Sequence, residues 1–170
     1  MVQAVIFLVF PLCLVFAAIT DFLEMTIPNR ISLVLAGAFF AIAPFVGLGW
    51  TEFGLHIVAA LSVFCVCFAL FAVNVMGGGD GKLLTAAALW FGFDPSLVSF
   101  LIYVAYIGGI LTILLLVVRS RASTVLAMGL PLPDSIVMAK KVPYAIAIAA
   151  GGMLAFAHSP LLNWALAASS

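Results

Sequence analysis

The chain has 170 residues, of which 67% are apolar and only 7% are Asp, Glu, Lys or Arg. Soluble domains carry about 25% charged residues, so this chain has too little polar surface to cover a globule in water and is expected to be an integral membrane protein. The formal net charge is zero, which argues against nucleic acid as a partner, and the apolar composition excludes a disordered or collagen-like chain.

Charged residues divide the chain into apolar stretches, each of which can be compared with the roughly 20 residues that a helix needs to cross a bilayer. Residues 2–20 carry no charge and predict a first transmembrane helix, which Asp21 ends. A polar segment follows, and residues 31–51 predict a second helix. Pro28 stands just before it, where a missing N–H costs little and a fixed φ sets the direction of entry.

The middle of the chain holds a third predicted helix and a short fourth one. Residues 53–79 are long enough for a span and part of a loop, and the loop is placed at 76–82. Residues 83–93 are uncharged, but as a helix they measure only about 17 Å, too short to cross alone. They can cross if the helix extends over 79–93 and the bilayer thins locally.

The last third of the chain predicts two further spans separated by a polar segment. Residues 95–118 form the first, the segment to Lys141 is interpreted as a loop at the membrane interface, and residues 142–170 form the last. The predicted fold is therefore an all-α, polytopic transmembrane bundle of about six spans. Residues 1–170 are expected to form a single membrane domain, because no linker or soluble domain is evident.

Basic residues set the expected orientation, because Lys and Arg favour the cytoplasmic side of short loops. If the chain starts outside and the short fourth stretch crosses, every basic residue lies on the cytoplasmic side, and the outer loops keep only Glu52 and Asp94. If that stretch does not cross, the four basic residues from position 119 onward move outside, so six spans are preferred. The basic residues are Arg30, Lys82, Arg119, Arg121, Lys140 and Lys141.

Cysteine placement does not support a metal site. Cys13, Cys65 and Cys67 all lie within apolar runs, so neither a disulfide framework nor a zinc site is indicated. We expect no metal and no cofactor.

Two acidic residues stand out once the spans are assigned. Asp21 ends the first helix and Asp80 begins the fourth on the same side, so both can meet at one membrane depth. Ionisable groups at membrane depth are costly and usually face a water-containing cavity or each other. Two close carboxylates share a single proton, because both cannot ionise cheaply. Such a pair can hydrolyse a peptide bond: the ionised carboxylate activates water and the protonated one polarises the carbonyl.

The glycines before Asp80 suggest close approach of a substrate. Gly77, Gly78 and Gly79 remove side chains where a substrate backbone would pass, and they permit positive φ, so that a loop can present Asp80. The substrate segment would have to be extended, since a helix hides its own peptide bonds.

Three motifs occur in order: Asp21 with Ile27-Pro28-Asn29, then Gly77-Gly78-Gly79-Asp80 with Lys82-Leu83-Leu84, then Lys141-Val142-Pro143-Tyr144-Ala145 before an Ala/Gly-rich helix. With these motifs the chain resembles the short type IV prepilin peptidases, which belong to the GxGD intramembrane aspartyl proteases. It is most similar to the small prepilin peptidase of tight-adherence (Flp-type) pilus systems, over essentially its whole length.

The resemblance implies that Asp21 and Asp80 are catalytic. It implies pilin-like precursors as partners, meaning Flp-type prepilins and pseudopilins, besides membrane lipids. Such precursors carry a short basic leader ahead of an apolar helix and are cut at the cytoplasmic face of the bacterial inner membrane, the face that the basic residues indicate. Larger members methylate the new amino terminus and carry CxxC motifs; this chain lacks those motifs, so methyltransferase activity is not expected.

Further candidates for substrate binding or loop geometry are Gly77, Gly79, Pro28, Asn29 and Lys82. Lys82 is more simply a determinant of topology, and Asn29 can hold its loop through a hydrogen bond from side chain to backbone.

Other interpretations remain open from the residues alone. Either aspartate by itself is more simply a helix cap or a solvated acid. As a pair, they could relay protons in an ion-coupled transporter or channel, although coupling acids usually lie near the midplane. A structural subunit of a pilus or secretion platform is a third possibility, in which a costly acidic pair would have no purpose.

Overall fold

The computed structural model describes residues 2–120 and 142–168, and every regular element in these ranges is a helix. Four helices are long and apolar enough to cross a membrane, and the bent pair α8 and α9 supplies up to a fifth span. The predicted all-α membrane bundle is therefore confirmed. The helices are α1 (Val2–Glu24), α2 (Asn29–Val46), α3 (Trp50–Ala72), α4 (Gly78–Phe91), α5 (Pro95–Ser120), α8 (Ala145–Phe156) and α9 (Pro160–Ala167).

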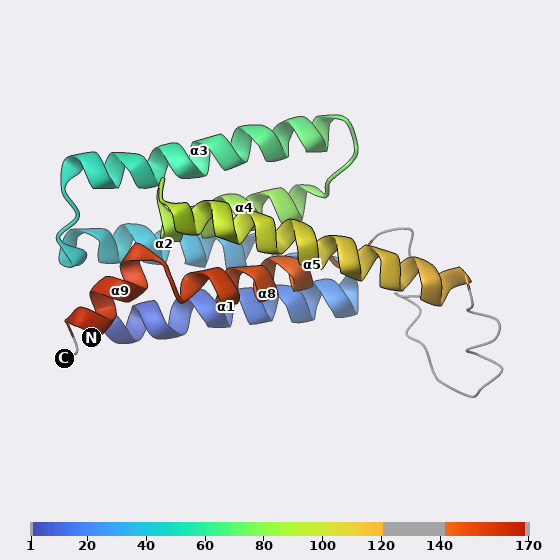
Figure 1. The fold of residues 1–170 in the computed structure, drawn as a ribbon, viewed down its shortest axis with the longest axis horizontal. Helices are drawn as coiled ribbons and strands as arrows, with labels where there is room; N and C mark the ends of the chain where they lie inside the picture. Colours follow the sequence, from blue (N-terminus) through green and yellow to red (C-terminus); the bar gives the residue numbers. More distant parts are fainter. Residues whose placement is uncertain (1, 121–141, 169–170) are drawn as a thin grey trace.

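Successive helices run back and forth along the long axis of the molecule (Figure 1). The start of α1 and the end of α9 lie at one end, and the connections from α1 to α2 and from α3 to α4 lie at the other. Helices α4 and α8 both begin at this second end and run in the same direction. Asp21 belongs to the last turn of α1 and Asp80 to the first turn of α4, so both lie at this second end, which we call the aspartate end.

Helix α4 occupies the middle of the bundle. It has 14 residues, which corresponds to about 21 Å. It packs against α2, α3 and α8, and almost all of its side chains from Leu83 to Phe91 are buried. The indole N–H of Trp90 donates to the carbonyl oxygen of Leu35 in α2 at 3.1 Å. Because protein rather than lipid surrounds α4, its length need not match the bilayer. The fourth helix, predicted over 79–93, starts one residue earlier and ends two residues earlier in the structure.

The predicted last span is interrupted. Helix α8 ends at Phe156, and α9 starts at Pro160 with its axis bent by 46°. The hydroxyl of Ser159 accepts a hydrogen bond from the N–H of Leu162 at 3.2 Å, and proline fits the first helical position, so a new helix begins there. The predicted interface loop falls almost wholly on residues 121–141, which lie outside the described residues, as do Arg121, Lys140 and Lys141.

Paired glycines bring α8 close to its neighbours. A Cβ on Gly151 would lie 2.8 Å from the backbone nitrogen of Val104 in α5, and one on Gly152 would lie 2.6 Å from Cδ1 of Leu14 in α1. Phe10 of α1 stacks on Phe156 of α8 with ring centroids 4.2 Å apart. Small residues therefore hold α8 tightly between α1 and α5, which fixes where α8 begins.

Candidate active site

Asp21 joins the end of α1 to the start of α8. Its side chain is only 6% exposed, and its Oδ2 accepts a hydrogen bond from the backbone N–H of Ala145 at 2.9 Å. The first N–H groups of a helix have no partner within the helix and form the positive end of its dipole. The start of α8 thus stabilises a carboxylate that burial would otherwise penalise.

The position of Asp21 within its helix differs from the prediction. Helix α1 does not end there but continues to Glu24, where Met25 adopts a left-handed conformation with φ +52°. Because the helix continues past it, Asp21 lies on α1 and its side chain contacts the start of α8, not a solvated loop.

Asp80 lies at the start of α4. As expected, Asp80 begins the fourth helix: α4 starts at Gly78 and Asp80 belongs to its first turn, so the loop predicted over 76–82 is shorter and ends at Gly77. A carboxylate in the first turn is favoured by the helix dipole. The expectation of positive φ is wrong: among the described glycines, only Gly47 and Gly92 adopt it, and Gly77 has φ −72°.

The glycines instead provide space. A Cβ on Gly77 would lie 2.8 Å from Oδ2 of Asp80, so the carboxylate occupies the place that a side chain at Gly77 would take. A Cβ on Gly79 would lie 3.2 Å from Cβ of Ile27, so the connection between α1 and α2 rests directly on the start of α4.

A second contact holds the same connection. Nζ of Lys82 donates to Oδ1 of Asn29 at 3.0 Å, which replaces the side-chain to backbone bond expected for Asn29. Pro28 precedes α2 as its N-cap with φ −60°, as predicted. The structure therefore brings the Ile27-Pro28-Asn29 motif and the glycine-aspartate motif together at the aspartate end.

A cavity of about 640 Å³ lies beside Asp80. Its walls come from the end of α3, the loop that follows, the start of α4, one residue of α5 and the segment that leads into α8. They comprise Leu70, Phe71, Asn74, Val75, Met76, Gly77, Gly78, Asp80, Thr112, Val142 and Tyr144. The lining mixes apolar side chains with a few polar groups, a composition suited to a peptide segment.

The two carboxylates both neighbour the 144–145 segment. Asp21 binds the N–H of Ala145, and Asp80 lines the cavity together with Tyr144, the preceding residue. Burial and, secondarily, the charge of Asp80 raise the pKa of the Tyr144 phenol above its ordinary value of 10.0. Both acids thus lie around one short stretch of backbone at the start of α8.

Sequence reasoning did not single out Tyr144, Asn74 or Thr112 as parts of the site. In the sequence Tyr144 is one residue of the 141–145 motif, and in the structure Asn74 is distinguished by its left-handed conformation, with φ +58°, in the turn after α3. Nothing in their spacing indicates that they share a cavity with Asp80.

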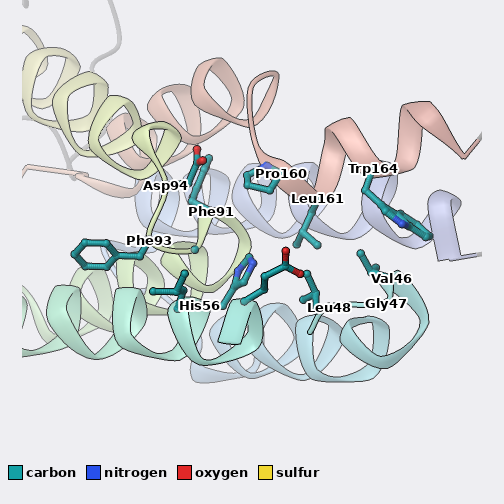
Figure 2. A pocket seen from close by; sticks show the side chains of 13 residues that line it. Val46, Gly47, Leu48, His56, Phe91, Phe93, Asp94, Pro160, Leu161 and Trp164 are labelled. Atoms are coloured by element: carbon teal, nitrogen blue, oxygen red, sulfur yellow. The ribbon is translucent and has the colours of Figure 1, made fainter. Parts of the chain in front are cut away.

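A separate cavity of about 460 Å³ lies at the opposite end of the bundle. Figure 2 shows His56 of α3 and Leu161 of α9 reaching toward each other across it, with Trp164 at one side. Nδ1 of His56 shares a hydrogen bond of 2.6 Å with the carbonyl oxygen of Leu89, which joins α3 to α4. Glu52 and Asp94, the two predicted outer acids, line this cavity. Within residues 2–120 and 142–168, no group of three or more His, Cys, Asp or Glu could hold a metal ion.

A known protein family matches more than half of the chain. The sequence model of the type IV leader peptidase family matches residues 8–117, a range that contains both Asp21 and Asp80. The chain belongs to the type IV leader peptidase family. This peptidase is a membrane protein, as its long apolar helices require. No curated protein and no solved structure matches the chain.

Proposed function

We propose that this leader peptidase is an aspartic endopeptidase in which Asp21 and Asp80 are the catalytic pair. The observation that carries the proposal is that both acids neighbour the start of α8: Asp21 accepts a hydrogen bond from the Ala145 N–H, and Asp80 lines a cavity with Tyr144. Two ionisable groups at the same end of a membrane bundle, one of which lines a cavity that can admit a peptide, support catalysis better than a purely structural role.

In the proposed reaction the two carboxylates hold one proton between them. The ionised carboxylate takes a proton from water as the water oxygen bonds to the scissile carbonyl carbon, and the protonated carboxylate donates toward the carbonyl oxygen. The tetrahedral intermediate then loses the amine, which takes a proton from the pair, and a carboxylic acid is left on the leader. Helix starts next to both acids provide positive dipole ends where negative charge develops.

The substrates that we propose are type IV pilin-like precursors, in particular Flp-type prepilins and pseudopilins. Their apolar helices would lie in the membrane beside the bundle, with the leader junction extended through the cavity next to Asp80. Arg30, Lys82 and Arg119 belong to helix ends at the aspartate end. The positive-inside rule therefore supports a cytoplasmic active site in the inner membrane. We propose that residues 1–170 form a single domain that has no methyltransferase activity.

Leader removal in cells tests the proposal. A Flp-type prepilin is co-expressed with the wild type, Asp21→Asn or Asp80→Asn, and its size is followed. Glu52→Gln and Asp94→Asn serve as matched controls, because each removes a carboxylate at the opposite end of the bundle. We expect the first two variants to accumulate uncut precursor and the controls to process it. Normal processing by Asp21→Asn and Asp80→Asn would exclude an aspartic mechanism and would favour a transporter or structural role.

A further inference from the structure

Tyr144 lies at the centre of the site, although the proposed reaction assigns it no role. Its backbone leads directly into Ala145, whose N–H is held by Asp21. Its side chain lines the cavity beside Asp80. The residue is therefore attached to one catalytic carboxylate through the chain and faces the neighbourhood of the other.

The orientation of the Tyr144 ring is fixed by α5. The hydroxyl and adjacent ring atoms occupy the place that a Cβ on Gly108 would take, so only glycine permits this packing. On the next residue, Gly109, a Cβ would meet nothing within 4 Å. The Tyr144 ring therefore packs against α5 at Gly108 and not at Gly109.

The Tyr144 hydroxyl has a hydrogen available for donation. Among residues 2–120 and 142–168 it has no hydrogen-bond partner, and it is not one of the fully enclosed polar atoms of that part of the chain. A buried or half-buried phenol normally finds a partner. A cavity that admits a peptide can supply one in the form of a substrate carbonyl.

Protonation favours a donor role. Burial, with a smaller contribution from Asp80, raises the pKa of Tyr144 above 10.0. The phenol therefore keeps its proton at neutral pH and does not act as a base. It can give a neutral hydrogen bond without adding a third negative charge to the site.

We propose that the Tyr144 hydroxyl donates a hydrogen bond to the scissile carbonyl oxygen and stabilises the negative charge that develops there in the tetrahedral intermediate. This inference rests on the proposed function. No covalent bond to Tyr144 forms, and the phenol keeps its proton throughout. A fixed donor aimed at a developing oxyanion acts mainly on the transition state. Tyr144 would then be a catalytic residue that contributes to kcat more than to KM.

The test compares Tyr144→Phe with Tyr106→Phe in the purified, full-length peptidase acting on a purified Flp-type prepilin. Phe retains the ring that packs on Gly108 and removes only the hydroxyl. Tyr106 is a matched control because it lies on α5 with 71% of its surface exposed and lines neither cavity. Loss of an oxyanion donor lowers kcat about 10²- to 10³-fold in known cases. We expect a loss of at least about tenfold for Tyr144→Phe, an unchanged KM and no effect of Tyr106→Phe.

A second pair of variants tests the placement of the ring. Gly108→Ala forces the Tyr144 hydroxyl away from its position, whereas Gly109→Ala adds a methyl group in open space. We expect Gly108→Ala to lower kcat and Gly109→Ala to leave it unchanged.

Each result bears on a defined claim. An unchanged kcat for Tyr144→Phe, or an effect confined to KM, would overturn the role of the hydroxyl while leaving the aspartic mechanism intact, provided that Asp80→Asn is inactive in the same assay. If Asp80→Asn cleaves as fast as the wild type, the proposed function itself fails, and the role of Tyr144 fails with it.

Discussion

Asp21 has a structural contact as well as a proposed chemical role, and two substitutions separate them. Asn at position 21 keeps an oxygen that can accept the Ala145 N–H bond, whereas Ala leaves that N–H without its partner. Hydrogen bonds to charged groups contribute about 1.5–3 kcal/mol and neutral ones about 1 kcal/mol, so Asp21→Asn should cost about 1 kcal/mol of unfolding free energy. An unsatisfied buried N–H costs about 1–3 kcal/mol, so Asp21→Ala should cost more.

Both variants should lose activity to the same extent, because both lack the carboxylate. General acid-base groups typically contribute about 10²- to 10⁴-fold to the rate. Thermal unfolding in detergent measures the structural part, with a shift of about 2–4 °C for each kcal/mol in a chain of this size. Cleavage of a purified prepilin measures the chemical part.

Two results would refute this reasoning about Asp21. If Asp21→Ala unfolds at the same temperature as Asp21→Asn, the bond to Ala145 does not stabilise the start of α8. If Asp21→Asn cleaves within about tenfold of the wild type, less than the range expected for an acid-base group, the carboxylate is not needed for the chemistry.

Further predictions concern packing and topology. Gly151→Ala should lower the unfolding temperature, because its Cβ would lie 2.8 Å from the backbone of Val104 and overpacking costs about 1–3 kcal/mol. Gly54→Ala, whose Cβ would have nothing within 4 Å, should leave the unfolding temperature unchanged. Equal unfolding temperatures for the two variants would contradict the close packing of α8 on α5. A reporter fused after Lys140 should lie in the cytoplasm, and a reporter fused after Ala168 should lie outside, because α8 and α9 together lead away from the aspartate end. If both reporters lie on the same side of the membrane, α8 and α9 do not form a final crossing.

Local sequence features were sufficient to locate the two acids and most of the helices. Asp21 and Asp80 stand at the borders of long apolar stretches, and the length of each stretch reports directly on whether it can span a bilayer. Pro28 likewise marks the start of α2 through its own backbone restriction. These properties depend on each residue and its neighbours in the chain, so sequence alone reveals them.

Features that depend on tertiary contacts were predicted less well. The glycines before Asp80 suggested positive φ, but their function in the structure is to let Ile27 and the Asp80 carboxylate approach. The short length of α4 predicted a locally thinner bilayer, yet α4 is packed against other helices. Tyr144 enters the site only because α8 is held between α1 and α5, and no spacing along the chain encodes that contact.

The central claim is that the carboxylates of Asp21, in the last turn of α1, and Asp80, in the first turn of α4, perform the hydrolysis. The most direct test is cleavage of a purified Flp-type prepilin by purified wild type, Asp80→Asn and Asp94→Asn, with both products identified by mass. The account predicts that the wild type and Asp94→Asn release the basic leader at the boundary with the apolar helix, and that Asp80→Asn releases none. Release of the same leader by Asp80→Asn at the wild-type rate would contradict the account.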